Sequence, residues 1–123
     1  MKKILVIEDD AALSKILFML LSKTGYEVII ASDAMQGINM AHQQKPDLII
    51  SDLMIPAGGG LNTIKNIKLS TLLKFIPVIV LTALRDEEYK KKVLDLGIEA
   101  YLEKPYEPEM LLQKIRDILG EGS

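Results

Sequence analysis

The chain has 123 residues, of which 49% are hydrophobic and 26% charged, with 15 lysines and arginines against 17 aspartates and glutamates. This length and composition are typical of one globular domain, and the absence of cysteine excludes disulfide frameworks, cysteine-ligated zinc and iron–sulfur clusters. The formal charge of −2, with cations scattered along the chain, argues against direct binding of nucleic acid.

Five short apolar runs alternate with amphipathic stretches along the chain. The runs are mostly aliphatic or β-branched, which predicts strands that are covered on both faces. They are Ile4–Ile7, Val28–Ala31, Leu48–Ile50, Val78–Leu81 and Ala100–Leu102.

Apolar residues at helical spacing fill the intervals between these runs. The stripes lie within residues 13–21, 34–41, 61–67, 89–96 and 111–118. Gly25 and Gly97 stand where two of these helices should end, and Asp33 and Asp86 where two should begin. The regular alternation predicts an α/β fold with a parallel sheet and helices on both faces, because right-handed crossovers place the helices there.

Polar side chains stand at the carboxyl ends of four predicted strands. They are Glu8, Asp9 and Asp10 after the first strand, Asp52 after the third, Thr82 at the end of the fourth and Lys104 after the fifth. In an open parallel sheet, ligands collect at the carboxyl ends of the strands. We therefore expect these side chains to form one site.

This set of side chains favours phosphoryl chemistry. Several carboxylates facing one lysine repel each other, and a hard cation such as Mg²⁺ or Mn²⁺ would neutralise them. Such a cation beside a carboxylate and a lysine is suited to phosphoryl transfer, and a carboxylate can itself attack phosphorus to give an acyl phosphate. Asp52, alone after the central strand, is the candidate nucleophile.

The sequence resembles the receiver domains of response regulators in two-component signalling, including the chemotaxis regulators, over residues 2–119. The motifs that carry the resemblance are Glu8-Asp9-Asp10, Ser51–Pro56 followed by Gly60, Thr82-Ala83 and Lys104-Pro105. The resemblance implies a three-layer, flavodoxin-like (βα)5 fold with the strand order 2-1-3-4-5. It also implies a receiver domain over residues 1–119, followed at 120–123 by a linker stub or tail.

The resemblance implies a role for each matching residue. Asp52 would accept a phosphoryl group from a phosphohistidine on a partner, either a sensor histidine kinase or a phosphotransfer protein. Asp9, Asp10 and Asp52 would hold Mg²⁺ (or Mn²⁺) together with the backbone carbonyl of Met54. Lys104 would contact a phosphoryl oxygen. The domain would catalyse only its own phosphorylation and dephosphorylation, and in that sense it is not an enzyme.

The resemblance also implies a switch. Thr82 would move toward the phosphoryl group and Tyr101 would turn inward behind it. Together they would reposition the face formed by the fourth helix, the fifth strand and the fifth helix, which is the usual output and homodimer surface of the family. Pro105, which often follows a cis peptide bond in this family, and Gly60 would be structural.

Several alternatives remain open on the sequence alone. Asp9 and Asp10 could cap and charge the first helix, and Tyr101 could be an ordinary half-buried aromatic residue. The chain could be an aspartate-nucleophile phosphatase of the haloacid-dehalogenase type, although those enzymes carry the nucleophile after the first strand. It could also be an adaptor that works without phosphorylation.

The chain is expected to work in the cytoplasm without contacting a membrane. No apolar run approaches the length of a membrane span, and the first run stops at Glu8, too early for a signal peptide.

Overall fold

The computed structural model describes residues 1–53 and 59–121, and strands and helices alternate along it as predicted. The elements are β1 (Lys3–Ile7), α1 (Ala11–Lys23), β2 (Glu27–Ala31), α2 (Ala34–Gln44), β3 (Leu48–Ser51), α3 (Gly59–Leu69), β4 (Val78–Thr82), α4 (Glu87–Leu94), β5 (Ala100–Glu103) and α5 (Pro108–Leu119). None of the helices in this described part is long and apolar enough to cross a membrane.

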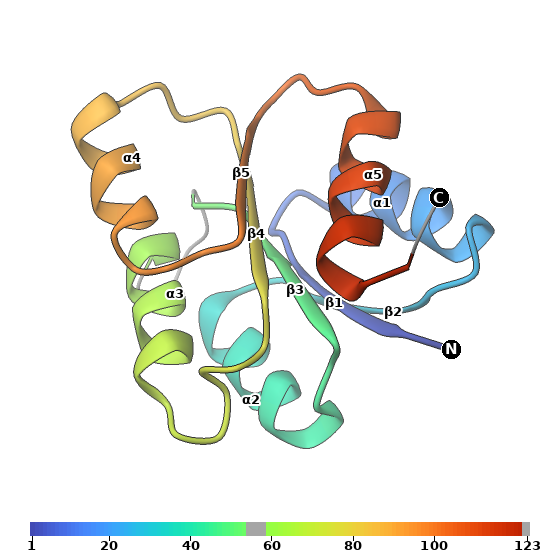
Figure 1. The fold of residues 1–123 in the computed structure, drawn as a ribbon, viewed down its shortest axis with the longest axis horizontal. Coiled ribbons are helices and arrows are strands. Elements are labelled where there is room, and N and C mark those ends of the chain that lie inside the picture. Colours follow the sequence, from blue (N-terminus) through green and yellow to red (C-terminus); the bar gives the residue numbers. More distant parts are fainter. Residues whose placement is uncertain (54–58, 122–123) are drawn as a thin grey trace.

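The five strands form one parallel sheet in the order β2-β1-β3-β4-β5, which confirms the predicted order (Figure 1). Ile7 at the end of β1 pairs with Ala31 on one side and with Ser51 on the other. Successive strands are added on one side of β1 and then on the other, so the order reverses between β1 and β3. The carboxyl ends at such a point of reversal are where this class of sheet binds ligands.

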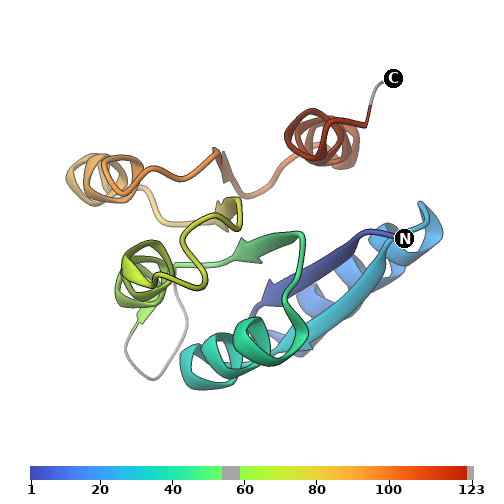
Figure 2. The same ribbon diagram turned by 60° about the horizontal axis from the view of Figure 1, so that its bottom comes forward.

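Helices cover both faces of the sheet and make three layers. The α1 and α5 helices pack on one face, and α2, α3 and α4 on the other (Figures 1 and 2). Alternate side chains of β1 point to opposite faces of the sheet. Leu5 and Ile7 pack in the apolar cluster with α2, α3 and α4, whereas Ile4 and Val6 pack in the cluster with α1 and α5. All four are buried, and the apolar residues of β3 and β4 are buried as well, so these three runs mark strands covered on both faces, as predicted. The edge strands β2 and β5 are only partly buried.

The helix boundaries follow from local hydrogen bonds. The carboxylate of Asp33 accepts the backbone N–H of Gln36 at 2.8 Å, and that of Asp86 accepts the backbone N–H of Tyr89 at 3.1 Å. Both are N-caps, as the sequence predicted. Gly97 follows α4 with a φ of +86°, a left-handed conformation that glycine adopts without a steric penalty.

Candidate functional site

The site lies where the backbone ladders of the sheet continue one step beyond the strands. The N–H of Glu8 donates to the carbonyl of Ala31 at 2.9 Å, and the N–H of Asp52 donates to the carbonyl of Ile7 at 3.1 Å. The N–H of Lys104 donates to the carbonyl of Thr82 at 2.8 Å. These bonds fix the backbone of three polar residues at the carboxyl edge, so their side chains start from defined positions.

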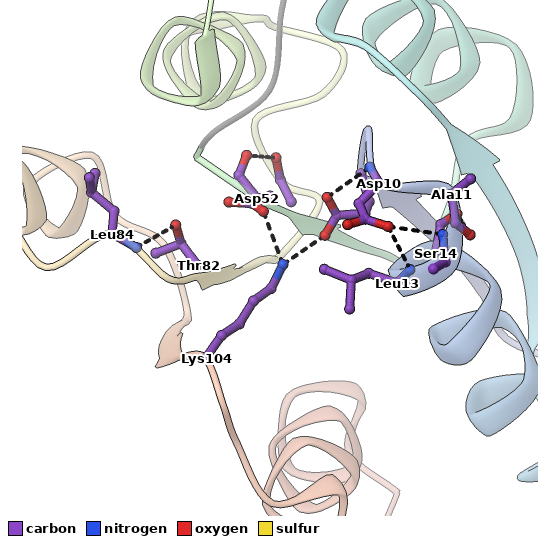
Figure 3. A network of polar contacts seen from close by, with 11 residues as sticks. Asp10, Ala11, Leu13, Ser14, Asp52, Thr82, Leu84 and Lys104 are labelled. Atoms are coloured by element: carbon purple, nitrogen blue, oxygen red, sulfur yellow. Dashed lines mark hydrogen bonds and ion pairs between the residues drawn. The ribbon is translucent and has the colours of Figure 1, made fainter.

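Lys104 joins two carboxylates that are far apart in the sequence. Its Nζ lies 2.8 Å from Oε1 of Glu8 and 3.0 Å from Oδ2 of Asp52 (Figure 3). The side chains are 16% exposed for Lys104, 4% for Glu8 and 10% for Asp52. The expectation that strand ends bring Asp52 and Lys104 together therefore agrees with the structure.

Burial and charge act against each other on these groups. Burial raises the pKa of Glu8, although the hydrogen bond from Lys104 opposes this effect. Burial alone would lower the pKa of Lys104, but its hydrogen bonds to Glu8 and Asp52 outweigh burial and raise the pKa above its usual value. Lys104 is therefore an ammonium at neutral pH. Within the described part of the chain, one ammonium pairs with these two buried carboxylates, so this group of three side chains has an excess of negative charge when both carboxylates are ionised.

The three acids after β1 take three different positions. Glu8 points into the site, whereas Asp9 is exposed. Asp10 is the N-cap of α1, because its Oδ1 accepts the backbone N–H groups of Ala12 at 2.9 Å and Leu13 at 3.2 Å. The capping alternative is therefore correct for Asp10, and its second carboxylate oxygen takes no part in these bonds.

The donors expected for a metal are oxygen atoms, which fit a hard cation such as Mg²⁺. Within residues 1–53 and 59–121, however, no group of three or more histidine, cysteine, aspartate or glutamate side chains is arranged to hold a metal ion. Met54, which was expected to contribute its carbonyl, lies outside the described residues. The ligand set Asp9, Asp10, Asp52 and Met54 thus stays a prediction.

Thr82 and Tyr101, the two predicted switch residues, have different surroundings. Thr82 is fully buried, and its Oγ1 accepts the backbone N–H of Leu84 at 3.2 Å. The hydroxyl of Tyr101 is buried and has no hydrogen-bond partner among the described residues. Its ring lies 5.0 Å from Nζ of Lys90, and burial, followed by the charge of Glu103, raises its pKa. A buried hydroxyl without a partner marks a place where rearrangement can satisfy a polar group.

Pro105 and Gly60, the two residues predicted to be structural, both occupy positions with special backbone geometry. The peptide bond between Lys104 and Pro105 is cis. The N–H of Gly60 donates to the carbonyl of Leu53 at 3.0 Å, and a Cβ on Gly60 would overlap the backbone of Leu53. This close approach requires glycine at the start of α3.

Sequence reasoning placed Glu8 among the expected site residues without giving it a role, and it did not include Arg85 at all. Glu8 had a usable signal, because it follows β1 directly and stands at the carboxyl edge. Arg85 had none: its Nη1 lies 2.7 Å from Oε2 of Glu103, and its Nη2 donates to the carbonyl of Lys104 at 2.7 Å. Those partners lie on another strand end, which no local pattern indicates.

An apolar hollow opens beside the cluster. It lies between α1 and the segment after β5, and it is lined by Glu8, Leu13, Ile16, Leu17, Ala83, Lys104, Pro105 and Tyr106. The side chain of Ile16 is 59% exposed at its rim. The chemical cluster therefore borders a surface that an apolar side chain of another molecule could contact.

Comparison with known proteins identifies the class to which this fold and cluster belong. Residues 4–116 match the sequence model of the response regulator receiver domain, so the chain belongs to this family.

Individual relatives agree with this assignment. The phosphate regulon transcriptional regulatory protein PhoB of Escherichia coli is 33% identical over 118 residues, which cover 96% of this chain and 52% of PhoB. The chain thus spans about half the length of the curated relatives it matches.

Solved structures share the fold. A CheY-like receiver domain protein of Methanospirillum hungatei superposes with a TM-score of 0.92 at 30% identity, covering 98% of this chain and 95% of that one. The receiver domain of a Pseudomonas aeruginosa sensor histidine kinase has a TM-score of 0.88 at 26% identity, with 97% and 98% coverage, and holds a magnesium ion in its active-site cleft.

Proposed function

We propose that Asp52 accepts a phosphoryl group from a phosphohistidine on a sensor histidine kinase or phosphotransfer protein, in a Mg²⁺-dependent reaction in the cytoplasm. The observation that carries this proposal is the buried carboxylate of Asp52, at the end of the central strand, with the Lys104 ammonium 3.0 Å away. Membership of the response regulator receiver family supports it, as does the similar receiver domain of a sensor histidine kinase.

The step is a nucleophilic displacement at phosphorus. A carboxylate oxygen of Asp52 attacks, the bond between phosphorus and the imidazole nitrogen of the donor breaks, and that nitrogen keeps the electron pair. The product is an acyl phosphate on Asp52. Lys104 stays protonated throughout, and its ammonium turns from the carboxylate to an oxygen of the phosphoryl group, where negative charge has been added.

Asp9, Asp10, Asp52 and the carbonyl of Met54 would hold the magnesium ion. The bound ion supplies positive charge that neutralises the transferring group. The magnesium-bound receiver domain of Pseudomonas aeruginosa supports this assignment. Asp10 would ligate through the carboxylate oxygen that does not cap α1.

Phosphorylation would be read out through Thr82 and Tyr101. Thr82 would exchange its bond with Leu84 for one to the phosphoryl group. The Tyr101 hydroxyl, which has no hydrogen-bond partner in the described part of the chain, would gain room for a new bond. We propose that this change alters the face formed by α4, β5 and α5, through which the domain would contact its output partner or a second copy.

The apolar hollow beside Lys104 supports a protein as the phosphoryl donor. A small phosphate ester would contact only the polar cluster, whereas a protein helix could also bury the exposed side chain of Ile16. This feature favours a signalling acceptor over a phosphatase that acts on small esters.

Intact-mass measurement after incubation with acetyl phosphate and Mg²⁺ tests the proposal. The wild-type protein should gain one phosphoryl group, Asp52→Asn should gain none, and the control Asp117→Asn, on the outer part of α5, should behave as wild type. Omitting Mg²⁺ should prevent the adduct. An unmodified wild type, or an adduct that survives Asp52→Asn, would contradict the proposal and favour an adaptor. Steady turnover of a generic phosphate ester would instead favour a phosphatase.

A further inference from the structure

Arg85 connects the segment after β4 to the end of β5. Its Nη1 lies 2.7 Å from Oε2 of Glu103, and its Nη2 donates to the backbone carbonyl of Lys104 at 2.7 Å. Both bonds are short and involve a charged group, which makes them stronger than bonds between neutral groups. The planar guanidinium can make both at once because its donors diverge in a fixed geometry.

The backbone of Lys104 is therefore held from two sides. Its N–H donates to the carbonyl of Thr82 at 2.8 Å, and its carbonyl accepts from Arg85. Thr82 is the last residue of β4, and Arg85 lies in the segment that follows it. From this fixed backbone the lysine side chain reaches Asp52 and Glu8.

A fixed backbone matters more for lysine than for most residues. The side chain is long and flexible, and its ammonium is a point charge without a preferred direction. The position of that charge at the phosphoryl group depends on where the side chain begins. A small displacement of a charged group from its working position reduces transition-state stabilisation strongly.

Arg85 itself does not touch the reacting atoms, and it contributes little to folding. The side chain of Arg85 is 56% exposed and that of Glu103 is 39% exposed. Ion pairs this open add little to stability, because water and salt screen them. An effect of Arg85 on reactivity should therefore appear without an equal effect on folding.

We propose that Arg85 is a positioning residue for phosphoryl transfer: its guanidinium holds the Lys104 carbonyl and thereby places the Lys104 ammonium beside Asp52. The inference rests on the proposed function, since it concerns the same reaction. It adds a residue that acts through Lys104 rather than on the phosphoryl group.

The first test compares rates of adduct formation from acetyl phosphate at saturating Mg²⁺. Arg85→Ala should be about three- to tenfold slower than wild type, an effect of the size expected from one typical hydrogen bond in a protein. Arg85→Lys should be intermediate, because one ammonium can pair with Glu103 but cannot reproduce both bonds. Arg116→Ala is the matched control: this arginine pairs with Glu109 at 2.8 Å on α5, away from the site, and its loss should leave the rate unchanged.

The decisive test is a double-mutant cycle with Lys104. If Arg85 acts through Lys104, then Arg85→Ala should have no further effect on the rate of a Lys104→Ala protein. If the double variant is slower than Lys104→Ala by the same factor that separates Arg85→Ala from wild type, Arg85 acts independently and the inference is overturned. Circular dichroism of each variant checks that it remains folded.

A measurement without phosphate separates the two proposals. In ¹⁵N-labelled protein, Arg85→Ala should shift the amide resonance of Lys104, whereas Arg116→Ala should leave it in place. A wild type that takes no phosphoryl group overturns the proposed function and this inference with it. A wild type that is phosphorylated no faster than Arg85→Ala, with an unshifted Lys104 resonance, overturns the inference alone.

Discussion

Two lysines at opposite edges of the sheet show what separates a reactive cluster from a structural ion pair. Lys104 stands at the carboxyl edge, with Nζ 2.8 Å and 3.0 Å from two carboxylates. Lys68 lies in the last turn of α3 and forms an ion pair at the amino edge of the sheet, where its Nζ lies 3.3 Å from Oε1 of Glu99. The two lysine side chains are similarly shielded, at 16% and 12% exposure, so burial of the lysine does not distinguish them.

The carboxylates make the difference. Glu99 is 37% exposed, pairs with one lysine, and also accepts the backbone N–H of Val78 at 2.8 Å. Its charge is balanced, and its bonds secure the start of β4. At the carboxyl edge, two shielded carboxylates share one ammonium among the described residues, so negative charge is left over there when both are ionised. In the proposed function, that excess would attract a cation, and Lys104 would exchange one oxygen partner for another.

The largest expected contrast is between removal of the two lysines. Lys104→Ala should slow phosphorylation by acetyl phosphate about ten- to hundredfold, because the transferring group loses a preorganised positive charge. Lys68→Ala should leave the rate unchanged. The initial rate of adduct formation, followed by intact mass, measures both. Equal slowing of the two variants would mean that neither lysine acts specifically at Asp52.

Alanine substitutions at Gly60, near the carboxyl edge, and at Gly97, near the amino edge, should differ in their effect on stability. Gly60→Ala places a Cβ against the Leu53 backbone, 2.6 Å from its carbonyl oxygen, and should lower the free energy of unfolding by roughly 2–4 kcal/mol. Gly97→Ala, before β5, meets nothing within 4 Å and carries only the strain of its φ of +86°, which should cost about 1 kcal/mol. Urea unfolding curves give both values. A Gly97 variant as destabilised as the Gly60 variant would refute the steric explanation.

The sequence was sufficient for the fold because its main determinants are local or periodic. Buried apolar runs gave the strands, and helical stripes gave the helices between them. The strands extend slightly beyond the predicted runs, as at Ser51, Thr82 and Glu103. These residues are polar, so hydrophobic patterning omits them, yet their backbone groups still join the hydrogen-bonded ladder.

The site was predicted only in outline, because the order of residues in the sequence does not determine the direction in which each side chain points. The acids after β1 are adjacent in sequence, but the turn into α1 sends Glu8 inward and uses Asp10 as a cap. Distinguishing them requires the backbone conformation of that turn. Arg85 could not be found for a similar reason, since its partners belong to the end of β5. Pairing of distant strand ends is a tertiary property.

The smallest expected effect lies at the amino edge, where Tyr26 precedes β2. Its hydroxyl donates to Oε1 of Glu121 at 2.6 Å, and burial, together with this bond, raises its pKa from 10.0 to about 12. The folded state therefore holds the phenol proton more tightly than the unfolded state. The stabilisation is fully present below pH 10 and is lost as the pH rises toward 12.

Ultraviolet titration should show Tyr26 ionising last in wild type, earlier in Glu121→Gln, and not at all in Tyr26→Phe. Both variants should be phosphorylated at the wild-type rate at neutral pH, because the hydrogen bond between Tyr26 and Glu121 does not position any charged group beside Asp52. A slower rate in either variant would show that the amino edge also influences the reactive cluster.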